Sequence, residues 1–362
     1  MGSGIMMCCN GVIFSRHPRI VSAAFENPIS GGGGDGGLSS RWKGLDQLDK
    51  ELSKGDERAA LNLVKDLQGK PGCLRCFGAA RQIPQRLYTL DELRLNGIET
   101  ASLLAPVDST LGSIERNLQI AVLLGGVAAW NVFGLSPQQI LFSSLGLLLL
   151  WTLDAVSFNG GVSFLVLDTI GHSISQKYHN RVVQHEAGHF LIAYLLGILP
   201  RGYTLTSLEA LKKEGSLNVQ AGTAFVDFEF LEEEICCILE ADLIYFDEGS
   251  FLLMQVSQEK VSATTLNRFA CIALAGVATE YLLFGYGEGG LADINTLDRL
   301  LKSLGFTQKK ADSQVRWAVL NTILILRRHE KTRAMLADAM SKGSSVGACI
   351  DLIEKTIDDA DL

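Results

Sequence analysis

The residues most able to do chemistry lie together in the segment His185-Glu186-Ala187-Gly188-His189, which reads HExxH. If this segment is helical, residues four apart project from one face, so the two imidazoles could bind a single Zn²⁺ ion. Glu186 leaves the helix at a neighbouring angle, where its carboxylate could accept a proton from water beside the metal. Two neutral nitrogen ligands, an open position for water and an adjacent base are the parts that a zinc peptidase needs.

The sequence around this motif predicts a buried helix. Apolar residues flank the motif from Val182 to Leu199, and Gly197 and Pro200 are typical of a helix end. The alternative interpretation is a core helix whose two histidines are satisfied by hydrogen bonds alone. We favour the metal interpretation because ionisable side chains in so apolar a helix are costly unless they are paired or ligated.

A catalytic zinc ion usually has three protein ligands, so a third ligand should follow the motif. The acidic and histidine candidates downstream are Asp293, Asp298, Glu280, Glu288 and His329. We expect one long apolar helix from Thr265 to Phe284, ended by Gly285, and this helix would carry Glu280. Asp293 follows the Gly-rich residues 286–290, which could form a tight turn that aims its carboxylate. Spacing alone does not choose among the candidates.

A long uncharged stretch precedes the motif. No residue from Asn117 to Leu153 is charged, and Ser136-Pro137-Gln138-Gln139 divides the stretch into two apolar halves. The halves, 118–135 and 140–156, are each close to the roughly 20 residues that a membrane-spanning helix needs. We therefore predict a transmembrane helical hairpin over residues 117–158. The alternative is a buried pair of helices in a soluble protein.

The N-terminal part of the chain has the composition of an organellar targeting sequence. Residues 1–25 contain no acidic residue and carry Arg16, His17, Arg19, several small residues and Ser, a composition typical of a transit peptide. A Gly-rich linker ends at residue 37. Residues 38–116 have the pattern of a small helical region, with a capping box from Thr89 to Glu92. Basic residues on both sides of the hairpin indicate that its two ends face the same cytosolic or stromal compartment.

A small β element and an insertion are expected after the motif. Residues 219–228 (VQAGTAFVDF) have a strand pattern, and residues 203–205 could form a second strand. A strand beside the motif helix could hold an extended peptide by backbone pairing. Residues 234–258 mix acidic residues with apolar clusters at no clear period, so we interpret them as an insertion or a gene-model error. Residues 331–362 are expected to form a helical tail.

The chain resembles the proteolytic domain of FtsH-type zinc metalloproteases over roughly residues 175–330. The resemblance rests on HEAGH, on residues 274–285 (LAGVATEYLLFG) and on the Gly-rich segment that ends in Ala292-Asp293. In that family, HEAGH is followed by a GGxAAExxxFG-like helix and then by an Asp that is the third zinc ligand. The N-terminal part with its hairpin is more similar to plant FtsH-peptidase-like proteins of plastids, also described as stress-regulated.

The resemblance implies a mainly α fold, in which a membrane hairpin precedes a helical zinc peptidase domain over 171–330 with a small β element. It implies that His185, His189 and Asp293 hold Zn²⁺ and that Glu186 is the catalytic base. The implied activity is that of a membrane-anchored endopeptidase acting on unfolded or membrane proteins. The implied location is a chloroplast membrane, thylakoid or inner envelope, with the peptidase domain in the stroma.

The chain departs from the full-length FtsH proteases, which carry an AAA ATPase module between membrane and peptidase. No GxxxxGK[ST] phosphate loop occurs in this sequence, and the short segment between the hairpin and the motif has no room for an ATPase domain. ATP-driven unfolding would therefore need a separate AAA ATPase or FtsH-like subunits as partners. The formal net charge of −8 argues against nucleic acid as a partner.

Two other functions fit the same residues. An intramembrane protease of the site-2 type also places HExxH on an apolar helix and uses a distant Asp, but that Asp lies in an LDG-like membrane segment. Asp293 instead has Gly-rich and acidic surroundings. The other alternative is a catalytically silent scaffold or assembly subunit with the FtsH-like fold. An intact Glu186 argues against it, because a scaffold needs no catalytic base.

Overall fold

The helix that carries the motif lies at the centre of a mainly helical protein. A computed structural model of the chain describes residues 35–68, 70, 72–134, 136–215, 221–226 and 262–362. The described residues are 74% helix with few strands, which confirms the mainly α fold class at this coarse level. Most of the predicted transit peptide and linker and the whole of the predicted insertion at 234–258 lie outside the described residues. Helix α1 begins at Asp35, inside the predicted linker.

The elements follow one another in a simple order along the chain. The N-terminal helices are α1 (Asp35–Lys54), α2 (Glu57–Gln68), α3 (Leu90–Leu95) and α4 (Thr100–Leu104). The middle of the chain forms α5 (Ser109–Phe133), α6 (Pro137–Ser157), α7 (Gly161–Ile174), α8 (Gln176–Leu195), β1 (Pro200–Thr204), α9 (Ser207–Glu214) and β2 (Gly222–Phe225). The C-terminal part forms α12 (Ala263–Ala273), α13 (Ala275–Phe284), α14 (Leu291–Ser303), α15 (Gln308–Arg328), α16 (Glu330–Ser341), α17 (Val346–Thr356) and the short 3-10 helix η1 (Asp359–Asp361).

Helix α8 is the core helix that positions the motif. Every residue from His185 to Leu195 is buried, and α13 and α16 pack against it. The Ser175 side chain caps the start of the helix by accepting from the Tyr178 N–H. The chain leaves the helix through Gly197, whose φ of 81° lies in the left-handed region that glycine adopts without strain. The predicted helix and its predicted end are therefore both present.

Gly188 of the motif lets α8 approach α13 closely. A Cβ atom at this position would overlap the Thr279 hydroxyl and would lie 2.9 Å from the Ala275 carbonyl oxygen. Thr279 is fully buried and Ala275 contributes a backbone atom, so neither can move away at low cost. Packing therefore requires a glycine at this position of HExxH.

We expect Gly188→Ala to lower the free energy of unfolding by about 1–3 kcal/mol, the usual cost of overpacking a close-packed core. The matched control is Gly112→Ala on α5, where no atom lies within 4 Å of the added methyl group. That change should be neutral or should stabilise by up to about 1 kcal/mol, because alanine favours helix over glycine. Denaturant unfolding of both variants checks the prediction, and equal effects would contradict it.

Helices α12 and α13 replace the single helix that the sequence predicts over 265–284. The helix is interrupted at Leu274, where ψ is −2°, and it ends at Gly285 as predicted. The combined segment is long and apolar enough to cross a membrane, but 67% of its most apolar window is buried inside the protein. These helices therefore belong to the core.

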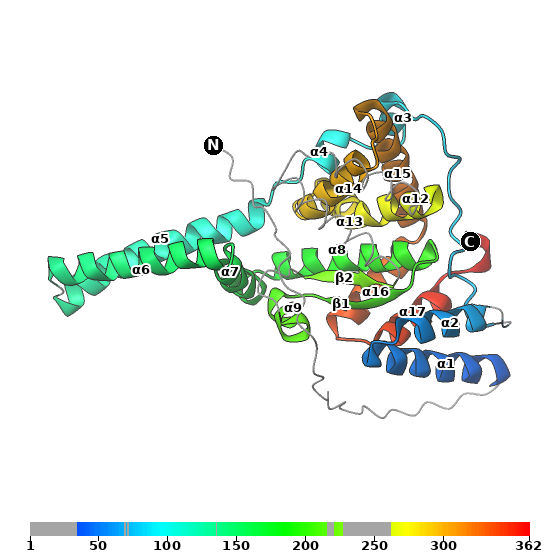
Figure 1. The fold of residues 1–362 in the computed structure, drawn as a ribbon, viewed down its shortest axis with the longest axis horizontal. Helices are drawn as coiled ribbons and strands as arrows, with labels where there is room; N and C mark the ends of the chain where they lie inside the picture. The colour runs from blue at the N-terminus through cyan, green and yellow to red at the C-terminus, as the bar shows by residue number, and fades with distance from the viewer. Residues whose placement is uncertain (1–34, 69, 71, 135, 216–220, 227–261) are drawn as a thin grey trace, which may run out of the picture.

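Helices α5 and α6 project together from the body of the protein, as Figure 1 shows on its left side. The chain runs out along α5, turns at Gly134 and returns along α6, whose start is fixed by a capping box between Ser136 and Gln139. Helix α6 is long and apolar enough to cross a membrane, and only 6% of its most apolar window is buried. Large apolar side chains of α5, such as Leu123 and Phe133, are also exposed. The predicted out-and-back pair of helices is thus present, and its insertion into a membrane stays a prediction.

The N-terminal and C-terminal helices share one core with the middle of the chain. Helix α1 packs against α17, and α16 packs against α8. A buried ion pair of 2.9 Å joins Arg41 on α1 to Asp351 on α17. The predicted boundaries at 116 and 330 therefore do not separate independent cores, because contacts between residues far apart in sequence cross both of them.

The small β element is a two-stranded antiparallel sheet beside α8. Strand β1 pairs with β2 so that Tyr203 lies opposite Thr223 and Thr204 lies opposite Gly222. Strand β1 overlaps the predicted strand at 203–205. Strand β2 lies within the predicted segment 219–228, whose ends are outside the described residues. Both strands contact α8, so the sheet places its side chains near the motif.

Candidate metal centre

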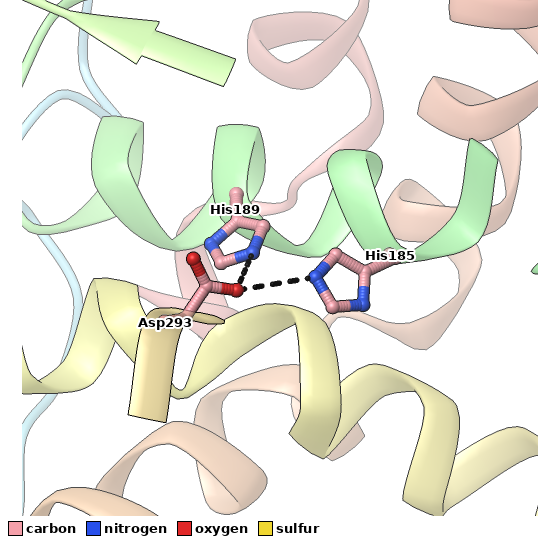
Figure 2. Close-up of side chains that lie close together, drawn as sticks. All are labelled: His185, His189 and Asp293. Carbon is pink, nitrogen blue, oxygen red and sulfur yellow. Dashed lines mark ion pairs between the residues drawn. The ribbon is translucent and has the colours of Figure 1, made fainter. Parts of the chain in front are cut away.

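Helices α8 and α14 bring His185, His189 and Asp293 together, as Figure 2 shows. The Nε2 atoms of His185 and His189 each lie 3.4 Å from Oδ2 of Asp293. One potential ligand atom from each residue lies within 4.8 Å of the other two. Asp293 is in the first turn of α14, which begins after Gly290 with a φ of 82°. The Gly-rich turn thus aims the Asp293 carboxylate at the two imidazoles.

The other predicted candidates for the third ligand lie elsewhere or have other partners. Asp298 forms an ion pair with Lys302 on the surface of α14. His329 is buried at the junction of α15 and α16 and is not part of the group. Glu280 and Glu288 lie behind His185, where both bind protein groups. Among the described residues, Asp293 is therefore the carboxylate that joins the two histidines of the motif.

Hydrogen bonds fix the orientation of both imidazole rings. The Nδ1 atom of His189 lies 2.8 Å from the carbonyl oxygen of Ile272, and Nδ1 of His185 lies 2.7 Å from Oε1 of Glu280. Because a carbonyl oxygen only accepts, Nδ1 of His189 must carry the hydrogen, which leaves the Nε2 lone pair of a neutral ring facing Asp293. Supporting acceptors of this kind are typical of histidines that bind metal ions. Two imidazole nitrogens and a carboxylate arranged in this way fit a zinc ion.

The break between α12 and α13 contributes to this arrangement. The last carbonyl groups of a helix have no partner within it. Ile272 is in the last turn of α12, so its carbonyl oxygen is available to His189. On the other side of the break, a Cβ atom at Gly276 would overlap the His185 ring. The interruption at Leu274 therefore provides an acceptor for the His189 ring, and Gly276 leaves space for the His185 ring.

The electrostatics of the group favour a cation. Partial burial opposes the ionisation of Asp293, but the polar contacts of its carboxylate with the His185 and His189 rings outweigh it and hold the pKa of this carboxyl below its ordinary value. Burial also opposes the ionisation of Glu280, but its contact with His185 and further hydrogen bonds lower its pKa to about 2. Without a metal ion, burial opposes the charging of His185, but the two carboxylates raise the pKa of its ring well above the ordinary value. Two ionised carboxylates thus act on one imidazole.

The carboxylate of Glu186 has a partner that the sequence analysis missed. The Thr223 hydroxyl on β2 donates a hydrogen bond of 2.8 Å to Oε2 of Glu186. Glu186 itself is buried, so this bond restrains the carboxylate beside the two histidines. The available sequence signal was the position of Thr223 within the predicted strand, but a strand pattern does not say which residue will meet the motif.

The geometry can hold a divalent metal ion next to a carboxylate that is able to move a proton. This interpretation depends on the residues and contacts of the chain itself. Comparisons of the chain with protein-family models, with curated proteins and with solved structures found no match.

Proposed function

We propose that the protein is a membrane-anchored zinc metalloendopeptidase that resembles the FtsH-type proteases in its site. One observation carries the proposal. The Nε2 atoms of His185 and His189 converge on a carboxylate oxygen of Asp293, while the opposite ring nitrogens are occupied by Glu280 and a backbone carbonyl. The resemblance of the motif and of residues 274–293 to that family points to the same three ligands.

In this proposal, His185, His189 and Asp293 hold the zinc ion and Glu186 moves the proton. Zinc, when bound, supplies a Lewis acid that acidifies water and polarises a peptide carbonyl group. The Glu186 carboxylate accepts the proton of the attacking water and passes it to the nitrogen of the leaving amine. The hydroxyl group of Thr223 keeps the Glu186 carboxylate in place through its hydrogen bond.

The β element supports extended, unfolded peptide as the substrate. In the part of the chain that the structure describes, β2 pairs with β1 and lies beside α8. Thr223 on β2 contacts Glu186, which places this strand directly beside the proposed base. An extended peptide that added to β2 by backbone pairing would pass near the zinc ligands. Folded proteins would first have to be unfolded, by a separate AAA ATPase or FtsH-like subunits.

The projecting hairpin supports attachment to a membrane. The exposed apolar surface of α5 and α6 would be covered by lipid, and the remainder of the protein would lie on one side of the bilayer. Together with the predicted transit peptide, this supports a chloroplast membrane, thylakoid or inner envelope, with the site in the stroma. The site-2-type alternative has less support, because the motif lies on α8 inside the body of the protein and not on the projecting helices α5 and α6.

One observation favours the alternative of a catalytically silent scaffold. The Asp293 carboxylate lies within ion-pair distance of both histidines, so these three side chains could satisfy one another without a metal ion. A scaffold would keep this pairing for stability alone. Metal content and cleavage therefore distinguish the two functions.

The proposal is tested with the full chain purified in detergent micelles. We expect about one zinc ion per chain and cleavage of an unfolded protein such as casein. Removal of zinc with a chelator should abolish cleavage, and returning zinc alone should restore it. A folded chain that takes up no zinc would overturn the peptidase proposal in favour of the scaffold. Zinc uptake without cleavage of any unfolded substrate would count against catalysis and leave a structural metal site.

A further inference from the structure

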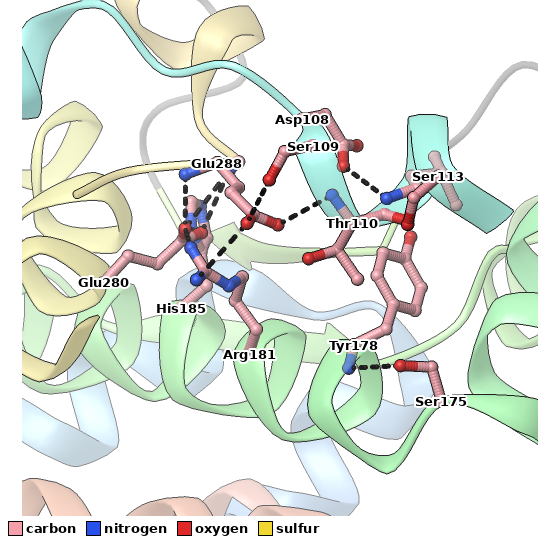
Figure 3. Close-up of polar contacts among 12 residues, drawn as sticks. Asp108, Ser109, Thr110, Ser113, Ser175, Tyr178, Arg181, His185, Glu280 and Glu288 are labelled. Carbon is pink, nitrogen blue, oxygen red and sulfur yellow. Dashed lines mark hydrogen bonds and ion pairs between the residues drawn. The ribbon is translucent and has the colours of Figure 1, made fainter. Parts of the chain in front are cut away.

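A series of polar contacts, buried except at its outer end, connects the metal centre to the base of the projecting hairpin, as Figure 3 shows. It begins at Glu280, whose Oε1 atom lies 2.7 Å from Nδ1 of His185. The same carboxylate accepts hydrogen bonds from the backbone N–H groups of Glu288, at 2.7 Å, and Gly289, at 3.2 Å. The Gly-rich loop between α13 and α14 thus holds the partner of a proposed zinc ligand.

Arg181 is the next member of the series. Its guanidinium donates to Glu280 over 2.8 Å and forms an ion pair of 3.5 Å with Oε1 of Glu288. Its side chain is 4% exposed, and the guanidinium carbon lies 4.2 Å from the ring centre of Phe284 and 4.9 Å from that of Tyr286. A guanidinium with this burial depends on both carboxylates, because an unpaired buried charge is strongly destabilising.

The first turn of α5 holds the outer end of the series. The Ser109 hydroxyl donates a hydrogen bond of 2.8 Å to Oε1 of Glu288, and the Thr110 N–H donates to Oε2 over 3.3 Å. The first backbone N–H groups of a helix have no partner within it, and the helix dipole favours a carboxylate there. Glu288 is 4% exposed, so it belongs to the interior and is not a surface contact. The hairpin thereby fixes the loop that leads into Asp293.

We propose that Glu288 and Arg181 are positioning residues for the metal centre and that the first turn of α5 is part of its support. Glu288 fixes the loop in two ways. Its backbone N–H orients Glu280, and its side chain attaches the loop to the base of the hairpin. Through Glu280 the series acts on His185, and through the loop it acts on the position of Asp293. Zinc affinity is therefore expected to depend on a contact made by the membrane hairpin.

This inference rests on the proposed function, because it requires a metal ion at His185. It goes beyond that function, because Glu288, Arg181 and Ser109 are not among the proposed zinc ligands. Groups that support metal ligands typically change metal affinity by about 10- to 100-fold when they are replaced. Glu288 lies one contact further from the metal than Glu280, so its effect should lie near the lower limit.

The test measures zinc dissociation constants by chelator competition, with the full chain in detergent micelles. We expect Glu288→Gln to weaken zinc binding about 10-fold and Ser109→Ala to weaken it by roughly 3-fold. The double variant should lose less than the product of the two single effects, because both changes act on one carboxylate. The cobalt-substituted Glu288→Gln chain should also show a shifted visible absorption spectrum, a signal of altered ligand geometry that a loss of general stability would not produce.

The matched control is Asp351→Asn, which weakens the buried ion pair with Arg41 on the α1–α17 face. Its zinc affinity should stay within about 2-fold of the wild-type value, because it shares no partner with the metal centre. An equal loss in Asp351→Asn would overturn the inference, since the effect would then be one of general stability. If zinc affinity is unchanged in both Glu288→Gln and Ser109→Ala, the inference is overturned. The proposed function still stands in that case, provided that the wild-type chain binds zinc. A wild-type chain that binds no zinc would overturn both. If Glu288→Gln fails to fold, the milder Ser109→Ala decides.

Discussion

Glu186→Gln is expected to abolish peptide cleavage while zinc binding stays at the wild-type level. General acid–base catalysis by a positioned side chain contributes about 10²- to 10⁴-fold, so kcat should fall by roughly that factor. Glutamine has the shape of glutamate and keeps an oxygen that can accept from Thr223, so the buried surroundings of the side chain are preserved. Zinc content should not change, because Glu186 is not a member of the ligand group.

The measurement is kcat on unfolded casein beside zinc content, for wild type and variant in parallel. Glu330→Gln is the matched control, since it makes the same change at an exposed acid on α16 and should leave both quantities unaltered. Retained cleavage in Glu186→Gln would remove this residue from the catalytic role. Loss of zinc together with cleavage would instead show that the carboxylate supports the metal.

Local sequence signals predicted the parts of the site that depend on short-range structure. The run of apolar residues around the motif indicated a buried helix, and α8 is buried at every position from His185 to Leu195. The glycine after the helix and the capping box at Thr89 were also predicted correctly, since each concerns hydrogen bonds within a few residues. The hairpin itself was predicted from a similar local signal, but its turn was expected at residues 136–139, whereas α6 begins at Pro137 with Ser136 as its cap.

The parts that the sequence did not predict depend on contacts between distant segments. The interruption at Leu274 is invisible in a continuous apolar pattern, yet it makes the Ile272 carbonyl available to His189. Thr223 reaches Glu186 only because β2 pairs with β1 beside α8. The shared core of the N-terminal and C-terminal helices likewise depends on packing across most of the chain, as the Arg41–Asp351 pair shows. Patterns along a sequence do not specify such pairings.

The third ligand was predicted only in part, because its choice depends both on local sequence and on contacts between distant segments. The Gly-rich segment predicted a turn that could aim an acid, but the distance along the chain from the motif to Asp293 allowed several candidates. The structure brings Asp293 to both histidines and leaves Asp298, five residues later, paired with Lys302 on the surface. The two acids differ because Asp293 is in the first turn of α14, whereas Asp298 lies further along the helix and pairs with Lys302.

Asp293→Ala is expected to weaken zinc binding by more than about 100-fold, the upper range for residues that only support ligands. Removal of this carboxylate takes away one of three protein ligands and also the anion that lies 3.4 Å from both Nε2 atoms. Cleavage should be lost with the metal, and a large excess of zinc should restore only part of it. Chelator competition and activity at increasing free zinc check both expectations.

Asp298→Ala supplies the matched control for this prediction, because it removes an acid from the same helix without touching the histidines. Its zinc affinity and cleavage should equal those of the wild type. If Asp293→Ala binds zinc as tightly as the wild type, another group must complete the ligand set. Glu280 is the carboxylate to examine next, since it already contacts His185 at 2.7 Å. In that event Glu280 would have to leave Arg181 to bind the metal ion. The hairpin could then not support the metal centre through the Arg181–Glu280 contact.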